Sequence, residues 1–279
     1  MASFLEKACI GDLVEKTLAE DISKGDITTR NIFSTEQKAM AEVVAREPMV
    51  LCGLEIFQAV FKALTPEVTF SCFDIKDGDD VKAEETIIKV ECGVIPLLEG
   101  ERSALNILQW LSGIATLTRK YVKEASPVKV LDTRKTTPGL RIFEKYAVKC
   151  GGGNNHRLGL YDQVLIKDNH IEAAGSITRA VKAIKEKSDN IIEVEVKNLE
   201  EVDEALSNNV DIIMLDNMDM DTMKKAINKI NGKAKTEISG GVTFNRLSEI
   251  SKTGADFVSI GALTHSAAAV DISMNIATK

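Results

Sequence analysis

The most constraining feature of the sequence is a series of short apolar runs that recur between helical segments from about Val128 onward. The runs read VKVLD, QVLIK, IIEVEV, DIIMLDN, KTEISGG and FVSIGA. The ends of the last five are separated by 28, 21, 23 and 22 residues, close to the length of one strand plus one helix. Continuous apolar strands between helices are typical of a parallel sheet that is covered on both faces. The pattern therefore predicts an α/β fold in this part of the chain.

Each of these five runs closes on a polar residue or glycine: Lys167, Glu195, Asp216, the Ser239-Gly240-Gly241 turn and Gly261. In a parallel barrel the site is built where the strands end, at the C-terminal face. A doubly wound open sheet is the alternative, and it would concentrate ligands at one switch point. Polar residues at successive strand ends favour a barrel, which is incomplete if only the six visible candidates are strands.

The first hundred residues show a different pattern. Helices are expected over SFLEKACIGDLVEKTLAED and LEIFQAVFKAL, and β-type runs over AEVVARE, EVTFSCFD and TIIKVECG. A long helix is expected to start at Pro96, because proline is tolerated in a first turn. Strands with interspersed helices indicate a small α+β layer ahead of the barrel.

Composition narrows the class of function. A net charge of −7 and a pI near 5.2 argue against nucleic-acid binding, whose electrostatic footprint is positive. The five cysteines are scattered and form no CxxC pair, which suits a reducing cytosol and gives no zinc site. The N-terminal segment is amphipathic and frequently charged, so we expect neither a signal peptide nor a membrane span. These features predict a cytoplasmic protein.

Positive charge is concentrated in one part of this acidic chain. Residues 131–170 contain seven Lys or Arg against four Asp or Glu, so the other 239 residues carry a net −10. Such a local excess favours a focused site for an anionic small molecule, although a solvated basic face would give the same count.

Two motifs carry most of this charge. In DTRKTTPGLR, the adjacent Arg134 and Lys135 follow a β-run, where they can point to opposite sides and serve different ligand groups. In KCGGGNNHRLGLYDQVLIKDNH, three glycines precede His156 and Arg157. Those glycines can bring backbone amides close to an anion, or they can be a flexible turn. A surface loop is the alternative for the Arg-Lys pair.

Acidic residues end two of the strands. Glu193 and Glu195 share one face of their strand, and Asp216 ends the next. Inward carboxylates among apolar residues are costly unless they are paired or bind metal, and oxygen ligands suit Mg²⁺. A structural network with Lys135 or Lys167 is the alternative. The glycine turns at Ser239-Gly240-Gly241 and at Gly261 follow the last strands, where barrels commonly bind phosphate.

Together these motifs resemble the quinolinate phosphoribosyltransferases (nicotinate-nucleotide pyrophosphorylases, carboxylating), which are type II phosphoribosyltransferases. The resemblance spans nearly the whole chain in family order. It rests on GDITT, ERSALNILQWLSGIAT, DTRKTTPGLR, EKYAVKCGGGNNHRLGLYDQVLIKDNH, EVEV, MLDN, ISGGV and SIGALTHS. Trp110 departs from the family, where a basic residue is common, but it lies outside the ligand positions.

The resemblance implies an N-terminal α/β sandwich domain over residues 1–110 and a C-terminal open α/β barrel over 111–266, with residues 267–279 returning to the first domain. It implies transfer of phosphoribose from phosphoribosyl pyrophosphate to quinolinate with Mg²⁺, yielding nicotinate mononucleotide, pyrophosphate and CO₂ in de novo NAD synthesis. It also implies a homodimer or larger homo-oligomer.

The same resemblance assigns roles to individual residues. The catalytic residues would be Lys135, Glu195 and Asp216. Quinolinate would be bound by Arg134, His156, Arg157 and Lys167, with Arg102 donated by the neighbouring subunit. Phosphoribosyl pyrophosphate would be bound by Lys135, Glu195, Asp216, Ser239, Gly240, Gly241, Gly261 and His265. Mg²⁺ would be held by Glu195 and Asp216, directly or through water or substrate.

Three other functions fit parts of the pattern. A related enzyme could use nicotinate or another ring acid, because the basic residues alone do not show how many carboxylates the substrate carries. An aldolase-type barrel could use Lys167 or Lys135 as a Schiff-base amine. A catalytically inactive module could bind phosphate without turnover.

Overall fold

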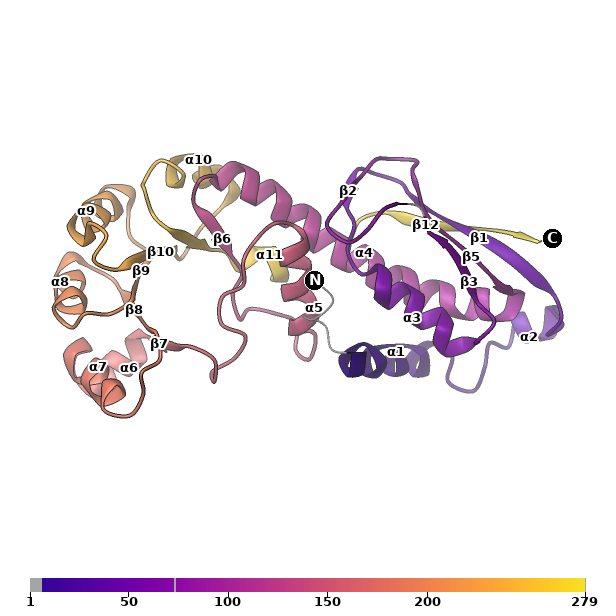
Figure 1. The fold of residues 1–279 in the computed structure, drawn as a ribbon, viewed down its shortest axis with the longest axis horizontal. Helices are drawn as coiled ribbons and strands as arrows, with labels where there is room; N and C mark the ends of the chain where they lie inside the picture. Colours follow the sequence, from indigo (N-terminus) through magenta and orange to yellow (C-terminus); the bar gives the residue numbers. More distant parts are fainter. Residues whose placement is uncertain (1–6, 73, 279) are drawn as a thin grey trace. The chain divides into compact units, whose positions relative to one another are not determined.

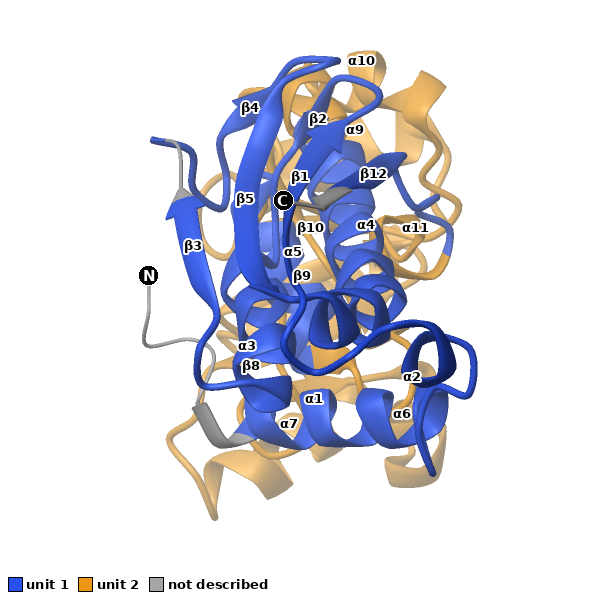
Figure 2. Cartoon of the chain, turned by 90° about the vertical axis from the view of Figure 1, so that its right-hand side faces the viewer, with its two compact units in different colours: residues 1–119, 142–152, 266–279 blue, residues 120–141, 153–265 orange. Residues whose placement is uncertain are grey.

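A computed structural model of the chain describes residues 7–72 and 74–278. The first residues of the helix expected from Ser3 lie outside this range. The chain divides into two compact units (Figure 2). Unit 1 comprises Met1–Arg119, Ile142–Gly152 and Ser266–Lys279, and unit 2 comprises Lys120–Arg141 and Gly153–His265. No helix in the described part of the chain is long and apolar enough to cross a membrane.

Unit 1 contains a four-stranded antiparallel sheet in the order β12-β1-β5-β3. Its strands are β1 (Lys38–Ala45), β3 (Thr69–Cys72), β5 (Thr86–Gly93) and β12 (Ile272–Thr278). A two-stranded ribbon joins β2 (Met49–Val50) to β4 (Asp80–Val81). The strands β1, β3 and β5 coincide with the three expected β-type runs. The C-terminal strand β12 pairs with β1 along seven residue pairs, from Ala39↔Thr278 to Ala45↔Ile272.

Helices pack against one face of this sheet (Figure 1). They are α1 (Lys7–Asp21), α2 (Thr29–Ile32), α3 (Leu54–Leu64) and the long α4 (Val94–Ala125). The helix α3 matches its expected range, whereas α4 starts at Val94, two residues before Pro96. Proline is tolerated there because first-turn amides have no intrahelical partner. Gly100 lets α4 approach α3 closely, since a Cβ on Gly100 would lie 2.8 Å from Cε1 of Phe61.

Unit 2 contains a six-stranded parallel sheet in the order β6-β11-β10-β9-β8-β7. The strands are β6 (Lys129–Leu131), β7 (Val164–Ile166), β8 (Ile192–Val196), β9 (Ile212–Asp216), β10 (Lys235–Ser239) and β11 (Phe257–Ser259). All six match the expected apolar runs. The first strand lies beside the last, as in a barrel, but no pairing joins β6 to β7 among the described residues. The sheet is therefore an open barrel, and the α/β fold class expected from the sequence is confirmed.

Helices follow the strands of unit 2, and those after β7, β8, β9 and β10 lie outside the curved sheet (Figure 1). They are α6 (Asp168–Ala174), α7 (Ile177–Lys185), α8 (Leu199–Ser207), α9 (Met220–Ile230), η1 (Phe244–Arg246), α10 (Leu247–Ile250) and α11 (Ala262–His265). Ser176, Asn198 and Asp219 cap three of them, each accepting a hydrogen bond from a first-turn amide through its side chain. These caps help fix where each strand ends and its helix begins.

The three consecutive glycines follow α5 (Arg141–Cys150). A Cβ on Gly151 would lie 2.5 Å from the carbonyl oxygen of Ala115, so this glycine allows close packing on α4. The amides of Gly151 and Gly152 donate to Ala147 O (3.0 Å) and Lys149 O (2.9 Å). The first two glycine amides thus complete a helix end, and the expectation that they approach an anion is wrong for both.

Candidate active site

The segment after the glycines continues the barrel at its open edge. Asn154 forms a parallel bridge with Leu131 of β6, and its amide donates to Val130 O (2.8 Å). The Asp132 amide in turn donates to Asn154 O (3.1 Å). This pairing places His156 and Arg157 beside the C-terminal end of β6, next to the strand end that carries Arg134.

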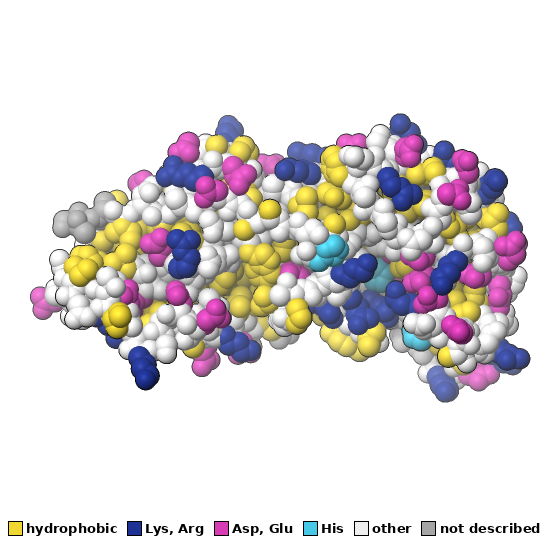
Figure 3. All heavy atoms as spheres, turned by 180° about the vertical axis from the view of Figure 1, so that it is seen from behind, with side chains coloured by type: hydrophobic (Ala, Val, Ile, Leu, Met, Phe, Trp, Pro, Cys, Tyr) yellow, Lys and Arg dark blue, Asp and Glu magenta, His cyan; other side chains and the backbone are white. Residues whose placement is uncertain are grey.

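A hollow of about 530 Å³ opens at the carboxyl ends of the strands of unit 2. It is lined by Thr133, Arg134, Lys135, His156, Arg157, Leu165, Lys167, Glu195, Met214, Asp216, Asn217, Glu237, Ser239, Gly240, Gly241 and Ser259. Ten residues expected in the site from the sequence are therefore brought together here. Figure 3 shows Lys and Arg side chains gathered near histidines on one face of this unit.

The basic side of the hollow is formed by Arg134, Arg157 and Lys167. Arg157 is only 7% exposed, and its Nη1 donates to Gln163 O (3.2 Å). Burial lowers the pKa of the Arg157 guanidinium, and the charge of Arg134 lowers it further. The Nε of Arg134 is buried without a hydrogen-bond partner among the described residues. Two neighbouring guanidinium groups with spare donors form a site that favours an anion.

The acidic side is formed by Glu195 and Asp216. The strand register puts Glu195 opposite Met214, and Asp216 follows two residues later on the same face of the sheet. Glu195 is 8% exposed, and its Oε2 lies 2.9 Å from Lys167 Nζ. Asp216 accepts a hydrogen bond from Asn217 Nδ2 (2.8 Å). An ion pair thus joins the acidic side to the basic side.

The glycine turn after β10 fits tightly against the end of β9. Gly240 has φ 86°, and a Cβ there would lie 2.3 Å from Asn217 Oδ1. Asn217 itself has φ 52°, and its amide donates to Ser239 O (3.0 Å). Both the backbone conformation and the close approach therefore require glycine at position 240.

Gly261 and His265 do not line the hollow but stand beside Lys135. A Cβ on Gly261 would lie 2.9 Å from Lys135 Cδ and 3.2 Å from His265 Nε2. Thr264 Oγ1 donates to Lys135 O (2.8 Å), which fixes the Lys135 backbone against α11. These residues extend the basic lining beyond the last strand.

Arg102 is separate from the other expected site residues. It lies on α4 in unit 1, its side chain is 60% exposed, and Nη2 lies 3.7 Å from Glu101 Oε1. It is not one of the residues that line the hollow.

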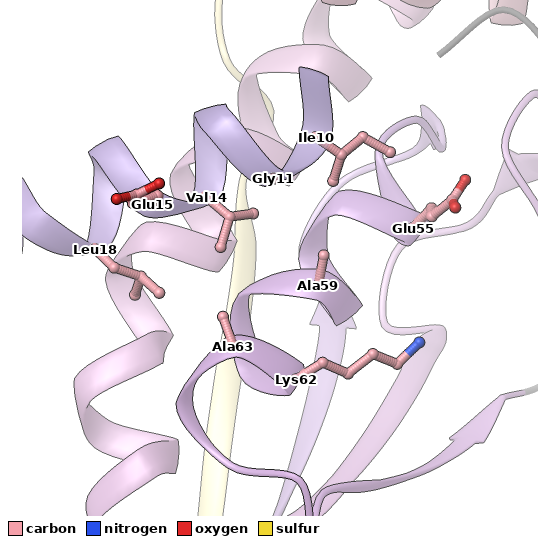
Figure 4. A pocket seen from close by; sticks show the side chains of 9 residues that line it. All are labelled: Ile10, Gly11, Val14, Glu15, Leu18, Glu55, Ala59, Lys62 and Ala63. Carbon is pink, nitrogen blue, oxygen red and sulfur yellow. The ribbon is translucent and has the colours of Figure 1, made fainter. Parts of the chain in front are cut away.

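A second hollow, of about 580 Å³, lies between α1 and α3 in unit 1 (Figure 4). Apolar side chains of both helices face it, and its charged residues are Glu15, Glu55 and Lys62. It contains none of the site residues expected from the sequence. Its slightly greater volume therefore does not outweigh the convergence of charged groups in unit 2.

Comparison with known proteins identifies the family. The N-terminal domain of quinolinate phosphoribosyl transferase matches residues 26–112, and the C-terminal domain of the same family matches residues 114–275. The chain belongs to the quinolinate phosphoribosyltransferase family. This membership confirms the resemblance seen in the sequence motifs.

Relatives match over nearly the whole chain. The probable nicotinate-nucleotide pyrophosphorylase (carboxylating) of Bacillus subtilis is 43% identical over 95% of this chain and 92% of its own length. The probable enzyme of the same name from Synechocystis is 44% identical over 94% of this chain and 91% of its own length. The crystal structure of NadC from Streptococcus pyogenes superposes with a TM-score of 0.95 at 42% identity, covering 99% of both chains.

Several lining residues of this family member were not expected from the sequence. Glu237 is 1% exposed on β10, two residues before Ser239 and on the same face. The alternation argument that was applied to Glu193 and Glu195 would have found it. Asn217 gave no comparable signal, because its role depends on a left-handed backbone conformation.

Proposed function

We propose that this chain transfers phosphoribose from phosphoribosyl pyrophosphate to quinolinate, giving nicotinate mononucleotide, pyrophosphate and CO₂ in de novo NAD biosynthesis. The observation that carries the proposal is a basic side (Arg134, Arg157 and Lys167) facing an acidic side (Glu195 and Asp216) across one hollow. The first side suits a dianionic acid, and the second suits a sugar that develops positive charge.

Quinolinate would enter with its two carboxylates toward the basic side. Arg134 and Arg157 offer planar forks that match carboxylates, while Lys167 offers a single point charge. Because Lys167 is already paired with Glu195, substrate carboxylate would compete with Glu195 for the ammonium. The contact with Glu195 also occupies the Lys167 side-chain nitrogen, which disfavours its use as a Schiff-base amine.

The sugar would lie on the acidic side. Loss of pyrophosphate creates oxocarbenium-like charge at C1, and the carboxylates of Glu195 and Asp216 can stabilise it. The pyridine nitrogen then attacks C1 with its own lone pair, so no serine or cysteine nucleophile is required. The ring nitrogen becomes cationic, the bond between C2 and its carboxylate breaks, and CO₂ leaves. The electron pair left on C2 is stabilised by the adjacent cationic nitrogen and takes up a proton from solvent, which gives nicotinate mononucleotide. A residue that held this carboxylate more tightly in the ground state than in the transition state would slow the step.

Magnesium fits the donor set of the acidic side. The half-buried Asp216 supplies carboxylate oxygens at the rim of the hollow, and Glu195 lies two strand positions deeper. Bound Mg²⁺ would neutralise charge on the pyrophosphate group. Ser239, Gly240 and Gly241 would border phosphate, with Lys135, Gly261 and His265 beside them.

The proposal includes assembly and compartment. A homodimer or larger homo-oligomer would complete the site by donating Arg102, which is exposed on α4 and paired only weakly, through Glu101 at 3.7 Å, among the described contacts. A cytoplasmic location is supported by the free cysteines Cys9, Cys52, Cys92 and Cys150.

Turnover by the purified protein tests the function. With quinolinate, phosphoribosyl pyrophosphate and Mg²⁺, we expect equal amounts of pyrophosphate and nicotinate mononucleotide. No pyrophosphate release would overturn the transferase. Faster turnover with nicotinate than with quinolinate would instead make the substrate a mono-acid.

A further inference from the structure

A buried polar cluster lies beneath the basic side of the hollow. Its members are His156, Gln163, Glu193 and Glu237, all from unit 2. Glu193 is completely buried on β8, and Glu237 is 1% exposed on β10. Neither carboxyl is part of the proposed contacts to quinolinate or to the sugar, so their burial requires another explanation.

A single oxygen of Glu193 links the two quinolinate-binding groups. Its Oε2 lies 3.1 Å from His156 Nε2 and accepts a hydrogen bond from Gln163 Nε2 (3.0 Å). The backbone carbonyl of Gln163 accepts a hydrogen bond from Arg157 Nη1 (3.2 Å). His156 and Arg157 are therefore both connected to the same carboxylate.

The other ring nitrogen of His156 is also engaged. Nδ1 accepts a hydrogen bond from the Arg157 amide (2.7 Å), so Nε2 is the ring nitrogen that carries hydrogen, and it lies 3.1 Å from Glu193 Oε2. The His156 amide donates to Asp132 Oδ1 (2.9 Å). With both nitrogens directed at protein groups, His156 is held in one orientation and one tautomer.

The two buried carboxyls of the cluster influence each other. Burial raises the pKa of Glu237 well above its ordinary value, and the neighbouring Glu193 raises it further. The raised pKa favours the neutral form of Glu237. Glu193 also favours the ionised form of the buried Arg157.

We propose that Glu193 is a positioning residue, which through its Oε2 holds His156 directly and Arg157 by way of Gln163, so that the quinolinate-binding groups form one preset unit. This inference rests on the proposed function for the identity of the ligand. Binding to groups that are already held in place loses less conformational entropy than binding to mobile groups. Removing the link should therefore weaken affinity without removing any group that contacts substrate.

Two substitutions at position 193 separate the acceptor from simple packing. In Glu193→Gln the side-chain carbonyl can still lie against His156 Nε2 and accept from Gln163, while the amide can donate to Glu237. In Glu193→Leu the volume is similar but the acceptor is lost. We expect Glu193→Leu to weaken quinolinate binding about tenfold or more by calorimetry, and Glu193→Gln by about threefold or less.

Kinetics and histidine spectra give independent readings. The KM for quinolinate should rise in Glu193→Leu while the KM for phosphoribosyl pyrophosphate changes by about twofold or less. The chain has three histidines, so the ¹⁵N signals of His156 can be assigned by substituting the other two. Wild type and Glu193→Gln should show the Nε2–H tautomer of His156, and Glu193→Leu should lose it.

A second variant and a control keep the test decisive if Glu193→Leu does not fold. Gln163→Leu, in the half-buried loop before β7, should weaken quinolinate binding about threefold and leave the His156 tautomer unchanged. Asp256→Asn, at the opposite ends of the strands, should lower stability but leave quinolinate affinity unchanged.

The positioning role is overturned if Glu193→Leu binds quinolinate with an affinity within twofold of wild type. If Glu193→Leu is unfolded, the same result in Gln163→Leu overturns it. It is equally overturned if Glu193→Gln is as impaired as Glu193→Leu, or if the His156 tautomer persists in Glu193→Leu. The histidine spectrum does not depend on turnover. Absence of nicotinate mononucleotide formation by wild type would therefore count against the proposed function, while the spectrum still reports on Glu193.

Discussion

Lys167 Nζ and Glu195 Oε2 lie 2.9 Å apart and join the basic and acidic sides of the hollow in unit 2. Lys167 is 45% exposed by its side chain and Glu195 is 9% exposed. The pair is consequently a partly solvated contact whose contribution to stability is about 0–1 kcal/mol. The pair matters because, before substrate binds, it engages two groups that are proposed to contact the substrates.

The first prediction concerns Glu195. Replacing Glu195 with Gln should lower kcat about 10²-fold, because a carboxylate aimed at the developing charge on the sugar is removed. The same change frees Lys167, so quinolinate affinity should hold or rise. Steady-state kinetics and calorimetry measure both quantities. A fall in quinolinate affinity with kcat unchanged would contradict this assignment, because it would show that Glu195 acts on quinolinate and not on the sugar.

The second prediction concerns Arg134. Arg134→Ala should weaken quinolinate binding by about 1.5–3 kcal/mol, which is the contribution of a charged hydrogen bond. Lys149→Ala, on the exposed side of α5, provides a control that removes a positive charge away from the hollow. Titration calorimetry of both variants decides the assignment, and unchanged affinity in Arg134→Ala would make Arg134 structural.

The third prediction compares two glycines with similar backbone conformations. Gly240 has φ 86° with Asn217 Oδ1 in the way of a Cβ, while Gly254 has φ 81° and open space. Gly254→Ala should cost about 1 kcal/mol of stability from backbone strain alone. Gly240→Ala should cost more and should also raise the KM for phosphoribosyl pyrophosphate. Equal effects of the two substitutions on stability and KM would show that the turn is not shaped by Asn217.

The fourth prediction concerns pH. The pKa of Glu237 is raised by burial, so the folded chain binds a proton that the unfolded chain loses above about pH 4. The free energy of unfolding therefore falls as the pH rises from there toward the raised pKa of the folded state. Glu237→Gln should remove this loss, so that in urea titrations the variant gains stability relative to wild type as the pH rises above about 4.5.

A carboxyl with the opposite shift provides the control. Burial raises the pKa of Asp256, but hydrogen bonds from Lys235 and Thr236 outweigh it and lower the pKa below its ordinary value. Its contribution to stability is present above about pH 4 and is lost as the pH falls further. Asp256→Asn should thus destabilise the protein near pH 7 and lose this effect below pH 3. A Glu237→Gln profile parallel to wild type would contradict the proposed protonation.

The fifth prediction concerns the sharing of sites between subunits. Arg102→Ala and Lys167→Ala should each be inactive alone, because they remove groups proposed to come from different subunits of one site. Mixing equal amounts under conditions that exchange subunits should restore up to about a quarter of wild-type activity in a symmetric dimer. No recovered activity at any mixing ratio would argue against donation of Arg102.

The parallel strands could be predicted from the sequence because each strand is a continuous apolar run whose burial depends little on detailed geometry. The runs ending at Lys167, Glu195 and Asp216 also predicted which side chains meet, since all parallel strands present their carboxyl ends at one edge. Other details could not be predicted in this way. Glycine is needed at position 151 because the carbonyl of Ala115 lies against it. Ala115 is 36 residues earlier in the chain and becomes a neighbour only after folding.

The residues that position other side chains could not be predicted from the sequence motifs either. Gln163 acts through one side-chain bond to Glu193 and one backbone bond from Arg157, and neither has a local sequence pattern. Asn217 depends on a left-handed conformation that many turn residues can adopt. Such roles arise from register between distant strands.

The pairing of β12 with β1 constrains the order in which the protein can mature. The two strands lie more than two hundred residues apart in the chain, yet they are neighbours in one sheet. A nascent polypeptide leaving the ribosome will expose β1 more than two hundred residues before this last partner emerges. The edge of β1 therefore stays uncovered during most of synthesis, and chaperones that shield bare strands would have their greatest effect there.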